Sequence, residues 1–127
     1  MLQIEHIALW TNDLERSKAF YETWLSAQAG AKYHNPAKGF SSYFLSFGKG
    51  ARLELMMREE LATAAAMPTI GYAHFALATG SVAAVNQLTE QLQAAGIPII
   101  DGPRWTGDGY YESVILDPDG NRVEITV

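Results

Sequence analysis

Four residues in this sequence have the types and spacing needed to bind a metal ion. Each half of the chain has one histidine in an apolar segment of strand length and one glutamate in a later apolar segment: His6 and Glu54, then His74 and Glu124. Burying an ionised carboxylate without a partner costs several kcal/mol. Two neutral imidazoles and two carboxylates around one divalent cation carry no net charge, so such a group is tolerated in a cavity of low dielectric constant. The four residues therefore predict a divalent-metal site.

The mixed nitrogen and oxygen donors suit several metals, namely Zn, Ni, Co, Mn and Fe(II), and the donor types alone do not choose among them. An octahedral ion with four protein ligands keeps two positions open for water or substrate. Structural zinc sites are normally closed. The predicted site is therefore of the catalytic type.

Each of the four residues also has an ordinary structural interpretation. A lone histidine on an apolar strand is more often a packed core residue. A lone glutamate in a last strand more often faces solvent or pairs with an arginine such as Arg52 or Arg122. The metal interpretation is favoured because the same pair of residue types occurs twice, at matching places of an internal repeat.

The repeat runs through the whole chain. The segment His6-Ile7-Ala8-Leu9 recurs as His74-Phe75-Ala76-Leu77, and Gly50-Ala51-Arg52-Leu53-Glu54-Leu55 recurs as Gly120-Asn121-Arg122-Val123-Glu124-Ile125. The matches come in the same order and at nearly the same spacing. Self-similarity of this kind indicates two copies of one structural unit.

The local patterns predict the same elements in both halves. Each half begins with a short apolar strand (3–10 and 72–79), followed by an amphipathic helix whose N-cap is Asp13 or Ser81. Gly30 and the sequence Gly96-Ile97-Pro98 are expected to end these helices. Three more strands follow in each half, at about 31–34, 40–47 and 51–57, then at about 98–101, 109–116 and 122–127. The fold class is therefore α+β.

Composition excludes several classes of protein. The chain has 127 residues, of which 48% are hydrophobic and 18% charged, as in an ordinary globular domain. Its net charge of −5 argues against nucleic acid as a partner. The absence of cysteine excludes disulfides and thiolate chemistry. No apolar run is long enough for a membrane span, and the N-terminus lacks the pattern of a signal peptide, so the expected location is cytoplasmic.

The chain resembles the vicinal oxygen chelate superfamily (glyoxalase, bleomycin resistance protein and dioxygenase) over essentially its full length. The resemblance implies two tandem βαβββ modules that form a curved mixed sheet around a metal cavity. The single domain 1–127 would then consist of modules 1–57 and 71–127, joined by a connector at 58–70 that could hold one short helix. Such proteins are commonly homodimers with sites at the subunit interface. The motifs that carry the resemblance are His6-Ile7-Ala8-Leu9, Asp13-Leu14-Glu15-Arg16-Ser17 with Phe20-Tyr21, Gly71-Tyr72-Ala73-His74-Phe75-Ala76-Leu77, and Asp117-Pro118-Asp119-Gly120-Asn121-Arg122-Val123-Glu124.

Glu54 separates the branches of this superfamily. Extradiol dioxygenases and fosfomycin-modifying transferases resemble a three-ligand version that has no protein ligand at this place. Methylmalonyl-CoA epimerases carry glutamine there, and bleomycin-binding proteins lack the ligands. Glyoxalase I has the same four residue types in the same order. The resemblance thus implies a glyoxalase I-like lyase or isomerase (lactoylglutathione lyase-like) with one divalent ion per site, Zn or Ni first, and Co, Mn or Fe as alternatives.

The chemistry implied by this resemblance is proton transfer next to a carbonyl, through a metal-bound enediolate. Glu124 is the candidate base and Glu54 its partner on the opposite side. The substrate is a small molecule, and its expected pocket residues are Trp10, Phe44, Met56, Tyr72, Trp105 and Tyr110.

Two positions depart from glyoxalase I at its glutathione site. Glyoxalase I has an arginine four residues after its first histidine, where this chain has Trp10. It also has an asparagine shortly after the first metal glutamate, where this chain has Met56, Met57 and Arg58. The use of glutathione is therefore open. The main alternative function is a non-catalytic small-molecule-binding protein of the antibiotic-resistance type, and a lesser one is an extradiol-type dioxygenase.

Overall fold

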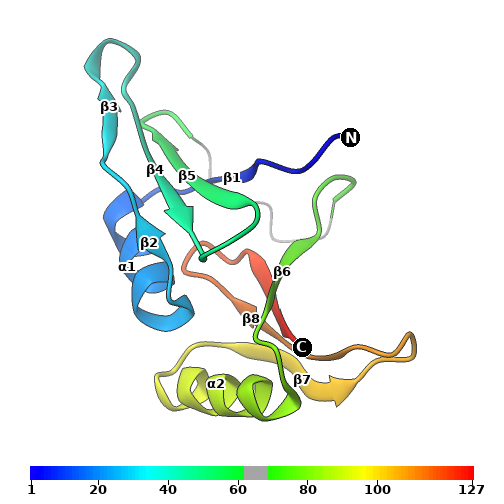
Figure 1. Ribbon diagram of the computed structural model, residues 1–127. Coiled ribbons are helices and arrows are strands. Elements are labelled where there is room, and N and C mark those ends of the chain that lie inside the picture. Colours follow the sequence, from blue (N-terminus) through cyan, green and yellow to red (C-terminus); the bar gives the residue numbers. More distant parts are fainter. Residues whose placement is uncertain (62–68) are drawn as a thin grey trace. The chain divides into compact units, whose positions relative to one another are not determined.

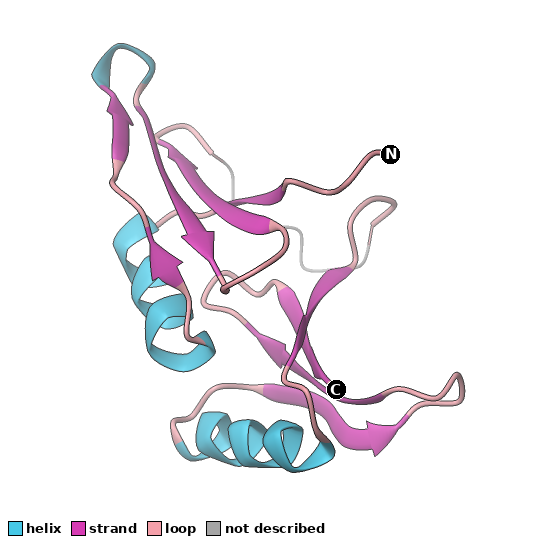
Figure 2. Cartoon of the chain, in the orientation of Figure 1, coloured by secondary structure: helices cyan, strands magenta, loops and turns pink. Residues whose placement is uncertain are grey.

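The computed structural model describes residues 1–61 and 69–127 and divides the chain into two compact units, Met1–Ala64 and Ala65–Val127. The Ala-rich part of the predicted connector, where one short helix was expected, lies outside the described residues. Figure 1 shows how the elements follow one another along the chain, and Figure 2 colours them by type.

The first unit is a five-stranded sheet with one helix against it. Its strand order is β1-β5-β4-β2, and β3 pairs with β4; β1 and β5 are parallel and the other pairs antiparallel. A short 3-10 helix, Pro36–Lys38, joins β3 to β4. The elements are β1 (His6–Trp10), α1 (Leu14–Leu25), β2 (Gln28–Ala29), β3 (Tyr33–Asn35), β4 (Phe40–Ser46) and β5 (Arg52–Arg58).

Helix α1 begins where the sequence predicts and ends earlier. The side chain of Asp13 accepts a hydrogen bond from the N–H of Arg16, as an N-cap does. The helix ends at Leu25 because Ser26 adopts a left-handed conformation, with φ of 56°. The prediction that Gly30 ends this helix was wrong. A serine here adopts the conformation that glycine usually takes at the end of a helix, so no glycine in the sequence marks the end of α1.

The second unit is a four-stranded sheet in the order β6-β9-β8-β7, with α2 packed against β7, β8 and β9. The N–H of Gly96 bonds to the carbonyl of Gln93 just past α2, with φ of 79° at Gly96, so this predicted helix end is confirmed. The elements are β6 (His74–Ala78), α2 (Val82–Ala94), β7 (Ile99–Trp105), β8 (Tyr111–Leu116) and β9 (Arg122–Thr126).

Strand β7 runs several residues past the predicted end at 101, because a bulge near Gly102 lets it stay paired with β8. Gly102 has φ of +75°, and a Cβ built there would lie 2.5 Å from the carbonyl oxygen of Glu112. Only glycine fits this close approach. The predicted strand ended at about 101, whereas the structure continues it through an irregularity in the pairing with β8.

The two units share one strand register around the candidate ligands. In the parallel pair β1–β5, His6 lies opposite Arg52 and Ala8 opposite Glu54. In the parallel pair β6–β9, His74 lies opposite Arg122 and Ala76 opposite Glu124. Because side chains alternate along a strand, the histidine and glutamate of each unit lie on the same face of their sheet. The glutamate is two residues further along its strand than the residue opposite the histidine. The sequence repeat is therefore also a structural repeat.

The opposite face of each sheet forms the core under the helix. Leu53 and Leu55 alternate with Glu54 and are 2% and 1% exposed. Val123 and Ile125 flank Glu124 and are fully buried. Burying such side chains supplies most of the free energy of folding. It also fixes the register, because a slip by one residue would turn the apolar set outward. The core thereby places each glutamate on the other face.

The predicted hairpin turn between β8 and β9 is confirmed. The N–H of Gly120 bonds to the carbonyl of Asp117 at 3.0 Å. The buried carboxylate of Asp117 accepts three further hydrogen bonds: from the N–H of Asp119 at 2.9 Å, from the N–H of Asn121 at 2.8 Å, and from the side-chain amide of Asn121 at 2.9 Å. This carboxylate holds the loop that leads into the strand of Glu124.

Replacing Asp117 by alanine is expected to lower the free energy of unfolding by about 3 kcal/mol. The change leaves three partly buried donors without their charged acceptor. Urea denaturation followed by circular dichroism measures the effect. Asp117→Asn, which keeps one acceptor oxygen, should lose less. A loss below about 0.5 kcal/mol in the alanine variant would contradict this role of the turn.

The fold class is α+β, as the sequence predicts. Within the described ranges, 1–61 and 69–127, no helix is long and apolar enough to cross a membrane.

Candidate metal centre

The first unit holds His6 and Glu54 side by side. The Nε2 atom of His6 lies 3.8 Å from a carboxylate oxygen of Glu54. The histidine side chain is 40% exposed and the glutamate side chain 15% exposed. Phe44, opposite Glu54 on β4, meets the imidazole edge to face at 5.2 Å between ring centroids. The pair thus packs against Phe44 and remains partly exposed to solvent.

The second unit holds His74 and Glu124 in the same arrangement. The Nε2 atom of His74 lies 3.2 Å from a carboxylate oxygen of Glu124, and the two side chains are 41% and 21% exposed. The residue opposite Glu124 on β8 is Val114, where the first unit has Phe44. Each unit therefore presents one imidazole nitrogen and one carboxylate from neighbouring strands.

These residues fit half of a metal site in each unit. Imidazole nitrogen and carboxylate oxygen are ordinary ligands of Zn and its neighbours, and the Nε2 atom of each histidine faces its glutamate. In the part of the chain that the structure describes, no three histidine, aspartate or glutamate side chains form a group suited to one ion. The structure accordingly brings the four predicted ligands together as two pairs.

Glu5, a residue that the sequence did not single out, contacts the first pair. Its carboxylate bonds to the Nδ1 atom of His6 and also to the guanidinium of Arg52, whose Nε lies 2.8 Å away. The hydrogen bonds with His6 and Arg52 hold the pKa of the Glu5 carboxyl below its usual range. Alternation along a strand would place Glu5 and His6 on opposite faces, so no periodic signal marks this contact.

Glu112 on β8 is a buried carboxyl beside the second pair. It is 7% exposed, and its Oε2 atom has no hydrogen-bond partner within the described residues. Burial raises its pKa, and the neighbouring carboxylate of Glu124 raises it further, while the charge of Arg104 opposes the shift. Ser42 occupies the equivalent place of the first unit, opposite Met56 as Glu112 is opposite Thr126. At this position the second unit therefore has an acidic group that the first unit lacks.

Replacing Glu112 by glutamine is expected to stabilise the metal-free protein at neutral pH. The folded state raises the pKa of Glu112, so ionisation costs folding free energy as the pH rises above the unfolded value near 4.5. The gain in unfolding free energy should be roughly 1 kcal/mol at about pH 8 and nearly absent at about pH 4. Urea denaturation at both pH values, after chelation, measures it. An equal effect at both values would contradict the ionisation argument.

Three of the predicted pocket residues lie on the face of the first pair. They are Trp10 on β1, Met56 opposite it on β5, and Phe44 on β4. Trp10 is 43% exposed and stands edge to face with Phe40, 6.4 Å between ring centroids. This end of the sheet face is therefore lined with aromatic side chains.

The other three predicted pocket residues have different surroundings. Tyr72 is 98% exposed in the segment before β6. Trp105 lies opposite Tyr111 and packs on it at 5.2 Å, and the hydroxyl of Tyr111 donates to Asn86 of α2. Trp105 is thus on the helix side of the sheet, away from the face of Glu124. Tyr110 is 58% exposed in a turn closed by hydrogen bonds with Thr106.

Arg58 extends the aromatic end of the first unit. Its guanidinium lies 4.8 Å from the ring of Trp10, a cation–π distance. It also lies 3.6 Å from the exposed carboxylate of Glu60. Phe40, the cross-strand neighbour of Arg58, packs against Tyr33 at 6.0 Å. One positive group thus sits on an aromatic surface about four residues along the strands from the His6–Glu54 pair.

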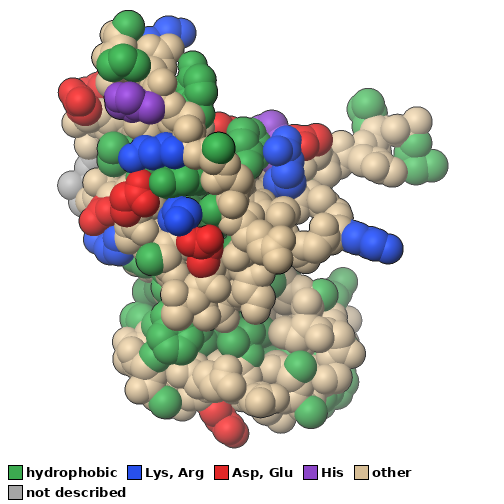
Figure 3. All heavy atoms as spheres, turned by 60° about the vertical axis from the view of Figure 1, so that its left-hand side comes forward, with side chains coloured by type: hydrophobic (Ala, Val, Ile, Leu, Met, Phe, Trp, Pro, Cys, Tyr) green, Lys and Arg blue, Asp and Glu red, His purple; other side chains and the backbone are tan. Residues whose placement is uncertain are grey.

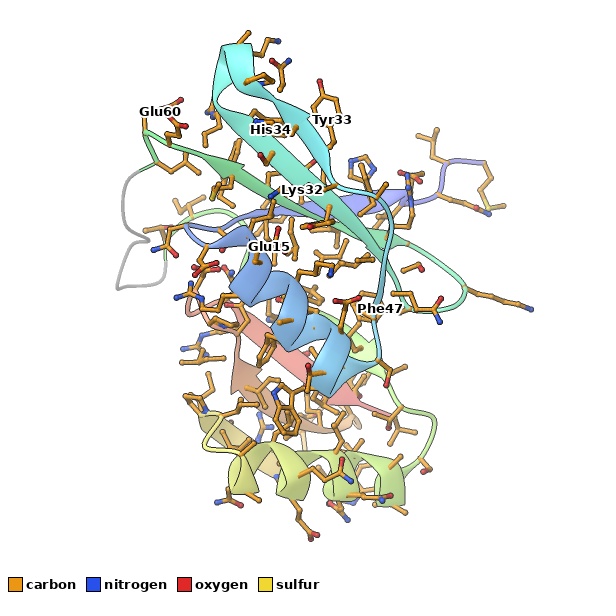
Figure 4. The ribbon with its side chains drawn as sticks, turned by 90° about the vertical axis from the view of Figure 1, so that its left-hand side faces the viewer. Glu15, Lys32, Tyr33, His34, Phe47 and Glu60 are labelled. Carbon is orange, nitrogen blue, oxygen red and sulfur yellow. The ribbon has the colours of Figure 1, made fainter. Side chains whose placement is uncertain are left out.

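The surface on the helix side of the first unit carries a separate polar network. Figure 3 shows acidic and basic side chains intermixed there, and Figure 4 shows Glu15 of α1 close to Lys32. Lys32 pairs with Glu15 at 3.0 Å, and the hydroxyl of Tyr43 donates to Glu15 at 2.9 Å. His34 on β3 bonds to the hydroxyl of Ser41 at 2.7 Å. These contacts tie α1 and β3 to the sheet.

Comparisons with known proteins place this fold in one family. Residues 3–125 match the model of the Glyoxalase/Bleomycin resistance protein/Dioxygenase superfamily. The chain is 29% identical over 129 residues to the uncharacterized protein YqjT of Bacillus subtilis (strain 168), covering 96% of each chain.

Solved structures agree in fold. A glyoxylase/bleomycin resistance protein/dioxygenase domain from Frankia sp. EAN1pec superposes with a TM-score of 0.86 at 17% identity, covering 100% of this chain and 98% of the other. The trypanothione-dependent glyoxalase I of Leishmania major gives 0.81 at 22% identity, with coverage of 99% and 86%. The repeated units, the shared register of their His–Glu pairs and the match over residues 3–125 lead to one conclusion: the chain belongs to the Glyoxalase/Bleomycin resistance protein/Dioxygenase superfamily, also called the vicinal oxygen chelate superfamily.

Proposed function

We propose that this protein is a divalent-metal-dependent lyase or isomerase of the glyoxalase I type, which moves a proton next to a carbonyl. His6, Glu54, His74 and Glu124 would hold one ion, and its donor set fits Zn or Ni first, with Co, Mn or Fe as alternatives. The observation that carries the proposal is the identical strand register of the two His–Glu pairs. A fold that needed these residues only for packing would have no reason to repeat both types at both places.

The two glutamates would have different roles. Glu124 is proposed as the base that removes the proton from one substrate carbon and returns it to the neighbouring carbon, with Glu54 as its partner carboxylate on the opposite side. A carboxylate held within hydrogen-bond reach of a substrate proton is a common general base. When bound, a divalent ion would polarise the substrate oxygens as a Lewis acid.

The second unit is proposed as the catalytic half and the first as the half that holds the substrate body. Glu124 has a second carboxyl beside it, Glu112, whereas the first unit has Ser42 there. The first unit instead offers the aromatic side chains of Trp10 and Phe40 with the guanidinium of Arg58. An asymmetric substrate, with a carbonyl end and a larger anionic or aromatic end, would suit this difference.

A homodimer with two sites at the subunit interface is proposed as the working assembly. Large hydrophobic side chains outside the sheets, among them Leu2, Ile4, Ile70 and Tyr72, are more than two-thirds exposed in the single chain. Surfaces of this kind are often covered by a partner.

The substrate assay should not be limited to the methylglyoxal–glutathione adduct, because Trp10 and Met56-Met57-Arg58 stand at positions where glyoxalase I binds glutathione. The adducts of methylglyoxal with several small thiols, and 2-hydroxy ketones, should be tested for metal-dependent isomerisation and for exchange of the carbon-bound proton with deuterium oxide. Deuterium incorporation that stops after chelation and returns with Ni or Zn would support the proposal. Its absence from every compound in the metal-loaded protein would count against it.

A non-catalytic binding protein is the second candidate, favoured by the exposed aromatic surface with Arg58 over Trp10. Metal dependence separates the two functions. A binding protein should hold an aromatic anion equally well after chelation, whereas the enzyme should lose its activity. An extradiol-type dioxygenase would consume oxygen with a catechol, and Glu54 makes it a weaker candidate because that chemistry leaves the fourth ligand position empty.

A further inference from the structure

The two candidate histidines have different surroundings, although their strands have the same register. Glu5 precedes His6, and its carboxylate bonds to Nδ1 of the imidazole. The equivalent residue before His74 is Ala73, which has no acceptor. Both units have an arginine opposite the histidine, Arg52 in the first unit and Arg122 in the second. Within the described residues, His6 thus has a carboxylate at Nδ1 that His74 lacks, whereas the Nε2 atom of each histidine faces a glutamate.

The contacts around Glu5 form a closed set. The guanidinium of Arg52 forms a two-pronged pairing with one oxygen of the Glu5 carboxylate, to which it donates through Nε at 2.8 Å and through a second nitrogen, while the other oxygen bonds to His6. The N–H of Arg52 also bonds to the carbonyl of Glu5 at 2.9 Å, which continues the β1–β5 pairing by one residue. The same guanidinium lies 4.2 Å from the ring of Phe44, and Phe44 packs edge to face on His6. Each member is therefore fixed by two others.

The consequence falls on the tautomer of His6. A carboxylate only accepts hydrogen bonds, so in the neutral imidazole Nδ1 carries the proton and Nε2 keeps its lone pair. Nε2 is the atom that faces Glu54. In metal sites a carboxylate on the far nitrogen of a ligating histidine fixes the tautomer and ring orientation, and strengthens the nitrogen as a ligand.

The geometry points to Glu5 as a positioning residue for His6, held in place by Arg52, so that the first unit presents its two ligands already oriented. His74, without such a partner, would be oriented only when the ion binds. This inference rests on the proposed function for the identity of the ligand that His6 receives. The tautomer of His6 is independent of it and can be measured without metal.

The first test is nitrogen NMR of the two imidazoles in the metal-free protein, about two pH units above the usual imidazole pKa of about 6.5. His6 should carry its proton on Nδ1 in the wild type and shift toward the Nε2 tautomer in Glu5→Ala. His74 should be unchanged by this substitution. A wild-type His6 protonated on Nε2, or a tautomer that Glu5→Ala does not alter, would overturn the inference.

The second test is the affinity for Zn or Co, measured by competition with a chromophoric chelator. Glu5→Ala should weaken binding about 10- to 100-fold, as loss of such a partner typically does. Glu5→Gln, whose amide oxygen can still accept from Nδ1, should lose clearly less. Equal losses in the two variants would mean that Glu5 itself binds the metal and would overturn the positioning role.

Arg52 and Arg122 supply a matched pair for the same measurement. Arg52→Lys removes the two-pronged pairing with Glu5 and should weaken metal binding several-fold. Arg122→Lys, at the same register position without a carboxylate at residue 73, should leave the affinity unchanged. Equal effects of the two substitutions would contradict the inference. A wild type that binds no metal, but whose His6 tautomer depends on Glu5, would count against the proposed function instead.

Discussion

Turnover by Glu124→Gln is expected to fall at least 100-fold, on the order of the usual contribution of a general base. Glutamine matches the size of glutamate and removes its ability to take a proton. Val123 and Ile125, which flank position 124, are fully buried on the other face of β9 and keep the strand in register. The variant should therefore fold, with an unchanged circular dichroism spectrum, and lose proton exchange between substrate and solvent.

Two other variants define this result. Glu54→Gln should also lose turnover by orders of magnitude, because it removes the partner carboxylate of Glu124 and one proposed ligand of the ion. Glu90→Gln, an exposed glutamate on α2 of the second unit, serves as the control and should retain wild-type turnover. Wild-type turnover in Glu124→Gln would remove Glu124 as the base, whatever the metal content.

The second large effect concerns the two histidines. His6→Ala and His74→Ala should each weaken binding of Zn or Ni by more than about 100-fold, since losing a ligand costs more than losing the partner of a ligand. Both substitutions should abolish binding of the same single ion. The affinity is measured by titration calorimetry or chelator competition on the purified variants.

The alternative arrangement gives a different result. If each unit bound its own ion through one His–Glu pair, His6→Ala would remove half of the metal and leave the rest at unchanged affinity. His34→Ala is the control, because His34 bonds to Ser41 between β3 and β4 on the first unit and belongs to neither pair.

Much of this architecture could be predicted because it depends on short-range patterns. The two helices follow from caps at Asp13 and Ser81, whose side chains accept from the backbone as expected. The last hairpin follows from the turn residues that begin at Asp117. The repeat predicts that the histidine strand and the glutamate strand stand at matching places in both halves, whereas their parallel pairing is known only from the structure.

Other features depend on contacts that no local pattern encodes. Ser26 ends α1 in a left-handed conformation without being glycine. Trp105 was expected in the pocket, yet a cross-strand pairing with Tyr111 places it on the helix side of its sheet. Aromatic residues pack equally well on either face of a strand, so their type could not decide the side.

The functional differences between the two halves were the least predictable. The carboxylate of Glu5 bonds to the side chain of the next residue, His6, although alternation along a strand places adjacent side chains on opposite faces. Glu112 stands where the first unit has Ser42, and its raised pKa depends on its burial beside Glu124. A repeat shows what two modules share. The sequence also shows where the modules differ in residue type, but the chemical consequence of each difference can be inferred only from the distances between side chains.

The central claim is that four ligands from the two units hold one divalent ion. Its most direct test is metal stoichiometry by elemental analysis, after reconstitution with Ni, Zn, Co or Mn, for wild type and Glu54→Gln. One tightly bound ion per chain, held more weakly by the variant, is the predicted result. A wild type that retains no metal from any of the four would contradict the claim, and would make a small-molecule-binding protein the better description of this chain.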